Sequence, residues 1–243
     1  MPPTRLLPRR PPPVRSPIHQ PTRTFLSSLL PTSPLPPQTL TASRRLPYNH
    51  AALYGLIADI NSYSAFLPYC SVSRVTAWTA HADPEFGRRW PTRADLTAGW
   101  GGLEQTYTSR VFCVPGSIVE ALSGEGARSG IAPDVLARHG LRDDPPSAST
   151  FAPTSPIGPS QGGEGVFKTL VTRWTVTPVK EGPAMDPRSV QTGGKQTEWS
   201  DIDLNIRFQF ANPLYAAVSS AVADKVAPIM IEAFVDRARK VLG

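Results

Sequence analysis

The chain has 243 residues, 40% of them hydrophobic, which is enough for one domain with a substantial core and some excess chain. Its net charge of +6 comes from the first 45 residues, which hold seven arginines and no acid, whereas residues 46–243 carry 18 basic and 19 acidic side chains. This distribution argues against a nucleic-acid-binding surface, and no stretch approaches the ~20 apolar residues that span a bilayer.

The leader, residues 1–38, has the composition of a mitochondrial transit peptide. It contains arginine, serine and threonine without acids, and Arg23-Thr24-Phe25-Leu26-Ser27-Ser28 is similar to a matrix processing site. A disordered basic tail is the alternative, because 13 of the 28 prolines lie before Tyr48 and oppose a long amphipathic helix. We expect the folded domain to occupy residues 39–243.

The first elements after the leader are short. Residues 40–46 predict a strand that ends at Pro47, and Asn49 can cap a helix whose apolar positions 53, 56, 57 and 60 follow helical spacing. Asn61-Ser62 interrupts this helix, and a second short turn precedes Pro68.

Strands dominate from residue 72 onward. Alternating or apolar runs predict strands over about 72–78, 90–100, 103–114, 117–122, 166–176 and 201–210, and Gly101-Gly102 predicts a two-residue hairpin turn. The alternation is strictest over 201–210, where one face is apolar and the other polar, so one face of the sheet is expected to meet water. Its expected partner is the strand over 166–176.

Two segments are poor in core-forming residues. Residues 123–165 contain eight glycines and six prolines, and residues 180–196 are similar in character. Such sequences bury too little apolar surface to offset their ordering entropy, so both are predicted to be flexible insertions. A short helix near 133–139 is the one element expected inside the first.

The C-terminal residues, about 213–241, predict one long helix that begins at Pro213 and kinks at Pro228. At 1.5 Å per residue this helix is roughly 43 Å long, and it is the only element long enough to cover the apolar face of the sheet. A helix about 10 Å wide cannot fill a broad curved sheet, and its facing residues between 216 and 226 are mostly alanine and valine. An apolar cavity or simple close packing would both fit this pattern.

Three motifs carry a resemblance to a known family. Phe66-Leu67-Pro68-Tyr69-Cys70, the strand ending Arg173-Trp174 and, above all, the run from Phe208 to Tyr215 resemble the mitochondrial coenzyme Q-binding START-domain proteins of the polyketide cyclase/dehydrase and lipid-transport superfamily. The resemblance covers about residues 40–122, 166–179 and 197–242. It implies an α+β helix-grip (START-like) fold, in which a curved antiparallel sheet wraps around a long C-terminal helix and two short helices lie near the N-terminus.

The resemblance also implies a function. It predicts a non-enzymatic protein, peripheral on the matrix side of the mitochondrial inner membrane, that binds and delivers ubiquinone and supports respiration and ubiquinone synthesis. Ubiquinone would be a bound ligand rather than a catalytic cofactor, and respiratory or quinone-synthesising complexes are candidate partners. A ribosome- or protein-binding module of the same superfamily and a cyclase/dehydratase-type enzyme are the alternatives. The insertion over 123–165 is longer than the family leads one to expect.

The predicted ligand contacts are apolar or aromatic, apart from one lysine that falls near the apolar face of the long helix and can donate a hydrogen bond or extend to water. For each of them, plain core packing would explain the residue equally well. The set is Phe66, Leu67, Pro68, Trp100, Trp174, Phe208, Phe210, Val218, Val222, Lys225, Val226, Ile229 and Met230.

No catalytic or metal-binding pattern emerges from the sequence. The four histidines have no ligand-type partner at metal-binding spacing, and the two cysteines, Cys70 and Cys113, are far apart and are expected to be free, buried thiols. Asp201 and Asp203 share a strand face, as paired catalytic carboxylates do, but that face is the polar one, so solvated charges explain them better.

Overall fold

The computed structural model describes residues 36–100, 103–124, 126–144, 167–179, 198–211 and 213–243, with the side chains of residues 100, 103 and 213–224 excepted. Residues 1–35 of the leader, Gly101-Gly102, residues 145–165 of the first predicted insertion and the whole of the second therefore lie outside the described residues. The expected hairpin turn and the transit peptide belong to these parts of the chain.

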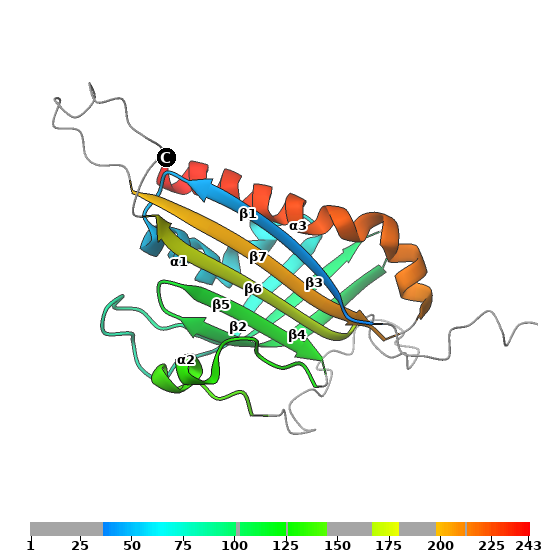
Figure 1. Cartoon of the computed structure of the whole chain (residues 1–243), viewed down its shortest axis with the longest axis horizontal. Coiled ribbons are helices and arrows are strands. Elements are labelled where there is room, and N and C mark those ends of the chain that lie inside the picture. The colour runs from blue at the N-terminus through cyan, green and yellow to red at the C-terminus, as the bar shows by residue number, and fades with distance from the viewer. Residues whose placement is uncertain (1–35, 101–102, 125, 145–166, 180–197, 212) are drawn as a thin grey trace, which may run out of the picture. The chain divides into compact units, whose positions relative to one another are not determined.

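Seven antiparallel strands form a single sheet in the order β1-β7-β6-β5-β4-β3-β2 (Figure 1). Apart from β1 and β7, neighbours in the sheet are consecutive in the sequence, and β6 pairs with β7 as expected. The strands are β1 (Gln38–Leu46), β2 (Cys70–Trp78), β3 (Pro91–Trp100), β4 (Leu103–Val114), β5 (Ile118–Gly124), β6 (Phe167–Val179) and β7 (Trp199–Phe210). The expected curved antiparallel sheet is confirmed.

Two short helices connect β1 to β2. Helix α1 (His50–Ala58) begins at Asn49, whose side-chain oxygen accepts hydrogen bonds from the backbone N–H groups of Ala51 and Ala52 at 2.7 and 3.3 Å. This cap satisfies backbone donors that have no partner inside the helix. A 3₁₀ helix, η2 (Ile60–Ala65), follows at once, so the break falls at Asp59 rather than at Asn61-Ser62.

The long helix α3 (Pro213–Leu242) packs against β1, β7 and α1. The helix continues through Pro228, and Figure 1 shows that α3 is bent along its length. Between α3 and the sheet lies the main core, where the Trp174 ring on β6 is 4.3 Å from the Phe234 ring on α3, measured between centroids. Helix and sheet are therefore in direct contact over the C-terminal half of α3.

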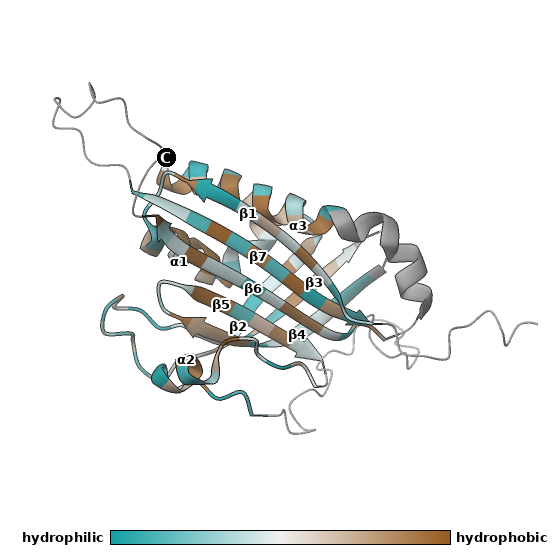
Figure 2. Ribbon diagram, in the orientation of Figure 1, coloured by the Kyte–Doolittle hydropathy of each residue, from teal (hydrophilic) through white to brown (hydrophobic). Residues whose placement is uncertain are grey.

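Strand β7 has the two-sided character that its sequence predicts. Its even-numbered residues from Ser200 to Phe210 are buried, whereas Asp203, Asn205 and Arg207 are exposed, and the colours along β7 alternate accordingly (Figure 2). The Asp201 carboxylate accepts two hydrogen bonds, of 2.7 and 2.8 Å, from Arg45 on β1, and these lower the pKa of Asp201. The polar face of this strand is thus a solvated face.

On β4, β5 and β6, the face of the sheet that is turned away from α3 is covered by residues 126–144. Residues 126–144 contain helix α2 (Pro133–Arg138), which confirms the short helix expected near 133–139, and they close a second buried cluster. That cluster consists of Phe112, Val114, Leu122, Ala127, Ile131, Leu136 and Val171. Residues 126–144 therefore differ from the expected flexible insertion. The sequence does contain a signal for this covering: the apolar run over residues 111–114 is uninterrupted, which is typical of a strand buried on both faces.

Candidate functional site

An apolar cavity lies between the sheet and α3. Its volume is about 200 Å³. A single water needs only about 10–15 Å³ of such volume, so the side chains that the structure describes leave this interior unfilled. The hollow expected between a curved sheet and a helix with small facing residues is therefore present.

All seven strands supply the floor and walls. Strands β3, β4, β5 and β7 do so through residues two apart, as the alternation of side chains along a strand requires. Cross-strand pairs carry this surface from one strand to the next: Leu96 pairs with Tyr107, and Leu170 pairs with both Ser123 and Phe208. The strand residues that line the cavity, those of β2 apart, are Leu40, Leu96, Ala98, Tyr107, Ser109, Val119, Ala121, Ser123, Phe167, Leu170, Thr172, Trp174, Ile206, Phe208 and Phe210.

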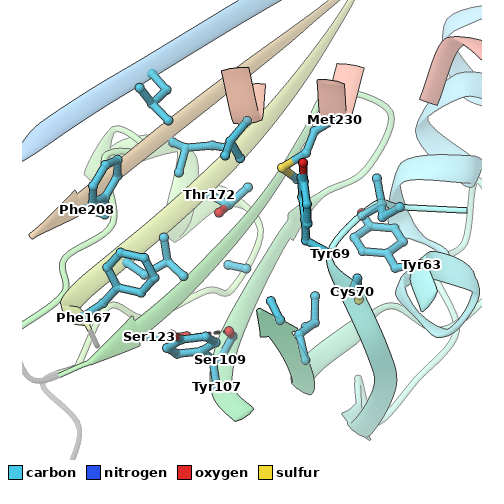
Figure 3. A pocket seen from close by; sticks show the side chains of 18 of the residues that line it. Tyr63, Tyr69, Cys70, Tyr107, Ser109, Ser123, Phe167, Thr172, Phe208 and Met230 are labelled. Carbon is cyan, nitrogen blue, oxygen red and sulfur yellow. Dashed lines mark hydrogen bonds between the residues drawn. The ribbon is translucent and has the colours of Figure 1, made fainter. Parts of the chain in front are cut away.

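The turn between η2 and β2 forms one end of the cavity. Leu67, Pro68, Tyr69 and Cys70 all line it, and Figure 3 shows Tyr69 and Cys70. Tyr69 has a φ of 64°, a left-handed backbone conformation that side chains other than glycine rarely adopt. Tyr69 is 43% exposed, more than any other described lining residue, so the lining reaches the protein surface beside this ring.

Aromatic rings cluster at the other end. The Phe167 ring lies 5.6 Å from Tyr107, 5.5 Å from Phe208 and 5.1 Å from Phe210, measured between centroids. Such rings give flat apolar surfaces with an edge-to-face or stacked packing preference. This end of the cavity offers a suitable environment for a planar ring.

Polar groups are few and uncharged. Ser109 and Ser123, both buried, share a hydrogen bond of 2.6 Å between their hydroxyl oxygens, and Thr172 adds a third hydroxyl (Figure 3). The Tyr63 hydroxyl donates to the carbonyl oxygen of Ile57, and burial raises the pKa of Tyr63. Among the described lining residues there is no Asp, Glu, His, Lys or Arg.

Seven of the thirteen predicted contact residues line the cavity. They are Leu67, Pro68, Trp174, Phe208, Phe210, Val226 and Met230. The side chains of three others, Trp100, Val218 and Val222, lie outside the described residues.

The structure places the remaining three away from the cavity. Lys225 is exposed, because Val226 and Met230 face inward and a residue one position earlier is turned by about 100° around the helix. Lys225 therefore points to water rather than into the cavity in this structure, and its role in ligand binding stays a prediction. Ile229, one residue before Met230, is half-buried but does not line the cavity for the same reason.

Phe66 packs against α3 rather than into the cavity. Its ring lies 4.9 Å from Phe234 and 5.9 Å from Tyr63, and the Arg237 guanidinium lies 5.6 Å from its ring centroid. The sequence places Phe66 next to true lining residues, but the turn directs neighbouring side chains to different sides. Its expected position in the cavity is therefore corrected.

The sequence-based reading missed the lining residues of β3, β4 and β5. Leu96, Tyr107, Ser109, Val119 and Ser123 line the cavity although none was singled out. Side chains on these strands alternate between the two faces of the sheet, as they do on β7. Once the strand pairing is known, this alternation identifies which residues face the cavity. The serines in particular have no apolar character that would mark them as interior residues.

The other reactive residue types do not assemble into a centre. No group of three or more His, Cys, Asp or Glu side chains that could hold a metal ion occurs within the described part of the chain. Both cysteines are free: Cys113 is buried, whereas Cys70 is half-buried at the cavity. The helices of the described residues contain no apolar stretch long enough to cross a bilayer.

Comparisons with known proteins agree with this geometry. The family model for polyketide cyclase / dehydrase and lipid transport matches residues 46–125 and 159–235. The coenzyme Q-binding protein coq10, mitochondrial, of Schizosaccharomyces pombe is 28% identical over 198 residues, which cover 82% of this chain and 85% of that protein.

Two further matches extend the comparison. The ribosome association toxin RatA of Pseudomonas aeruginosa is 37% identical over 78 residues, which cover 32% of this chain and 48% of that protein. The Zhui aromatase/cyclase from Streptomyces sp. R1128 has a similar fold, with a TM-score of 0.51 and 10% identity over 85% of this chain and 96% of that one. The fold expected from the sequence is confirmed.

Proposed function

The chain belongs to the polyketide cyclase/dehydrase and lipid-transport family, and on that premise we propose that it binds and delivers coenzyme Q or a related prenylated quinone without catalysing a reaction. The observation that carries the proposal is the apolar cavity of about 200 Å³ between α3 and the sheet. The 28% identity to a coenzyme Q-binding protein over most of both chains supports this choice of ligand.

The lining suits a ligand that is mainly hydrocarbon. Burying apolar surface is favourable by about 25 cal/mol per Å², and Trp174, Phe208 and Met230 offer such surface to an isoprenoid chain. A bilayer interior offers nearly the same gain, so the tail gives little net preference for the protein. The preference must come from the quinone ring and its fit, and the carrier lowers the barrier to moving the lipid.

The entrance is assigned to the turn that carries Leu67, Pro68 and Tyr69. This turn lies at the cavity's exposed end, so its movement together with α3 would open a path for an isoprenoid chain. We place the membrane-docking surface here. A quinone would then exchange with the bilayer without passing through water.

A carrier fits the lining better than a cyclase does. A cyclase or dehydratase needs acid and base groups that reach the substrate, and the described cavity residues are apolar, aromatic, hydroxyl- or thiol-bearing. A protein-binding module would have no need of an unfilled interior. These two arguments favour lipid binding over both alternatives.

The proposed location is the matrix side of the mitochondrial inner membrane, where the protein would be peripheral and would support respiration and ubiquinone synthesis, with respiratory or quinone-synthesising complexes as partners. The arginine-rich, acid-free leader over residues 1–38 supports import. Import of the full chain into isolated, energised mitochondria should shorten it within the leader, near Arg23 to Ser28, and leave the product extractable by carbonate. An unprocessed product that remains outside would contradict this location.

The ligand is tested directly by extracting the purified full chain with organic solvent and identifying bound lipids by mass spectrometry. We expect a prenylated quinone in a ratio that approaches one per chain. Ala121→Phe places a large ring in the cavity and should abolish co-purification, whereas Thr76→Phe, at an exposed position of β2, should not. Circular dichroism confirms that both variants fold.

Two other outcomes would favour the rivals. Recovery of no quinone together with co-sedimentation with ribosomes would replace lipid binding by the activity that the RatA relative's name describes. Chemical conversion of an added aromatic polyketide by the purified chain would favour the cyclase.

A further inference from the structure

We propose that the hydroxyl pair of Ser109 and Ser123 is the ring-binding subsite of the cavity, and that it donates a hydrogen bond to a carbonyl oxygen of the quinone. The ligand then binds ring-first, with its ring among the aromatic side chains and its chain leading toward Tyr69. This inference rests on the proposed function, since it assigns a place and an orientation to the quinone.

The two serines meet because of the strand register. Arg110 on β4 pairs with Leu122 on β5, so the next residues along, Ser109 and Ser123, are opposite each other on the cavity side. Each side chain is buried, with 5% of its residue surface exposed, and the two oxygens are 2.6 Å apart. Two hydroxyls thus lie side by side in an interior that is otherwise mostly apolar (Figure 3).

One of the two hydroxyl hydrogens of this pair has no acceptor within the pair. Two hydroxyls carry two hydrogens, and their mutual hydrogen bond uses one of them. Neither Ser109 nor Ser123 forms another hydrogen bond in the described structure. A buried hydroxyl hydrogen without an acceptor is unfavourable, so the pair is poised to donate to an oxygen that enters the cavity. A quinone carbonyl is such an acceptor, and an isoprenoid chain has none.

The surroundings of the pair suit a planar ring. Tyr107 is two residues before Ser109 on β4 and faces the same side, and Ser123 pairs with Leu170, which pairs with Phe208. The Phe167 ring lies 5.6 Å from Tyr107 and 5.5 Å from Phe208, measured between centroids. A ring held by the serines would therefore lie against aromatic faces, where stacking adds to the hydrogen bond.

The position of the entrance sets the orientation. Tyr69 is the exposed lining residue, and Figure 3 shows it beside Met230, across the cavity from Ser109, Ser123 and Tyr107. If the ring occupies the serine end, the chain extends along the apolar surface toward Tyr69 and Met230. The polar part of the ligand enters first, and the hydrocarbon part remains nearest the bilayer.

The experiment measures a carbonyl vibration and an affinity. A short-tailed ubiquinone with ¹³C-labelled ring carbonyls is bound to the full chain, and its C=O stretching frequency is compared in the wild type and in Ser109→Ala/Ser123→Ala. A lower frequency than in a hydrocarbon solvent is expected for the wild type and not for the double variant. The affinity should fall about three- to tenfold, the effect of one neutral hydrogen bond.

The double variant is chosen because it removes both partners at once. Replacing both members of a hydrogen-bonded pair by apolar groups leaves no orphaned polar atom and is close to neutral for stability. Each single alanine variant keeps one hydroxyl and should retain most of the affinity. Ser200→Ala is the matched control, because Ser200 is also buried but its hydroxyl donates to the Tyr48 carbonyl oxygen at 2.9 Å, away from the cavity.

Squalene, a chain without oxygen, separates ring recognition from packing. It should bind the wild type and the double variant equally. Equal loss of squalene and ubiquinone binding, or an unchanged carbonyl frequency in the double variant, would overturn the inference while leaving the carrier function intact. Failure of the wild-type chain to bind any ubiquinone would overturn both.

Discussion

Arg173 on β6 reaches across the outer face of the sheet to Glu120 on β5, and its Nε and Nη2 atoms lie 2.9 and 2.6 Å from the same carboxylate oxygen of Glu120. Glu120 is fully buried and also accepts hydrogen bonds from the Ser129 hydroxyl and the Gly130 backbone N–H. One carboxylate therefore joins the back of the cavity-forming strands to the segment 126–144 that covers them.

Removal of this carboxylate should destabilise the fold. Glu120→Ala leaves Arg173 without its acceptor, and breaking a buried pair costs about 3 kcal/mol of unfolding free energy. Asp236→Ala is the control, because Asp236 pairs with Arg239 at the surface, where such pairs are worth less than about 1 kcal/mol. Urea unfolding measures both, and equal effects would contradict a structural role for Glu120.

Gly124, at the end of β5, should be irreplaceable. Its φ is +90°, and a Cβ atom there would lie 2.1 Å from the backbone carbonyl oxygen of Lys168 on β6. Gly124→Ala must separate two paired strands next to Ser123, so we expect a loss of roughly 3 kcal/mol or more and weaker quinone binding.

Gly126 provides the matched control for Gly124. It also has a positive φ, +74°, but no atom lies within 4 Å of a Cβ built there. Gly126→Ala should therefore lower the free energy of unfolding by only about 1 kcal/mol, the cost of holding an alanine in the left-handed conformation. Chemical unfolding that gives similar values for the two variants would show that the close approach to Lys168 is unimportant.

Tyr69 combines an unfavourable backbone conformation with a position at the cavity entrance. Its carbonyl oxygen accepts a hydrogen bond of 3.0 Å from the Gly99 N–H, which helps to hold the positive φ. Tyr69→Gly adopts this conformation freely, so stability should change by less than about 1 kcal/mol while the absent ring speeds quinone release. Tyr69→Val should lose about 1–2 kcal/mol, because a β-branched residue fits poorly at positive φ.

The measurements for Tyr69 are stopped-flow quinone transfer to acceptor vesicles and urea unfolding. Slower release from Tyr69→Gly than from the wild type would place the entrance elsewhere. Equal stability of the Gly and Val variants would show that the backbone at residue 69 is not constrained.

The two thiols should differ in their response to alkaline pH. Burial raises the pKa of Cys113 from its ordinary value of 9.0 to about 12, so the folded state holds this proton more tightly than the unfolded state. The associated stability is complete below pH 9 and is lost as the pH rises from 9 toward 12. Unfolding free energy should fall less steeply over this interval in Cys113→Ala than in the wild type.

Thiol alkylation gives an independent measurement. At pH 8, iodoacetamide should modify half-buried Cys70 in the native protein and Cys113 only after unfolding. Rapid native labelling of Cys113, or identical pH slopes for the wild type and Cys113→Ala, would contradict the buried environment.

The local sequence determined the elements of this protein. Strict alternation from residue 201 to 210 predicts β7 with one solvent-exposed face. Asn49 caps the start of α1, and the apolar stripe of the C-terminal residues predicts α3. Each of these signals is a repeat or a cap that depends on neighbours within a few positions. The lining roles of Trp174, Phe208 and Phe210 followed from the same signals.

Tertiary structure alone decided which of these residues share the cavity. Ser109 and Ser123 become neighbours only through the register of β4 with β5, Lys225 turns to solvent only because Val226 and Met230 face inward, and Phe66 leaves the cavity only because its turn packs on Phe234. Side-chain alternation and helical periodicity fix directions relative to an element. The direction of the element relative to its partners depends on contacts between residues far apart in the chain, and a local pattern carries no information about them.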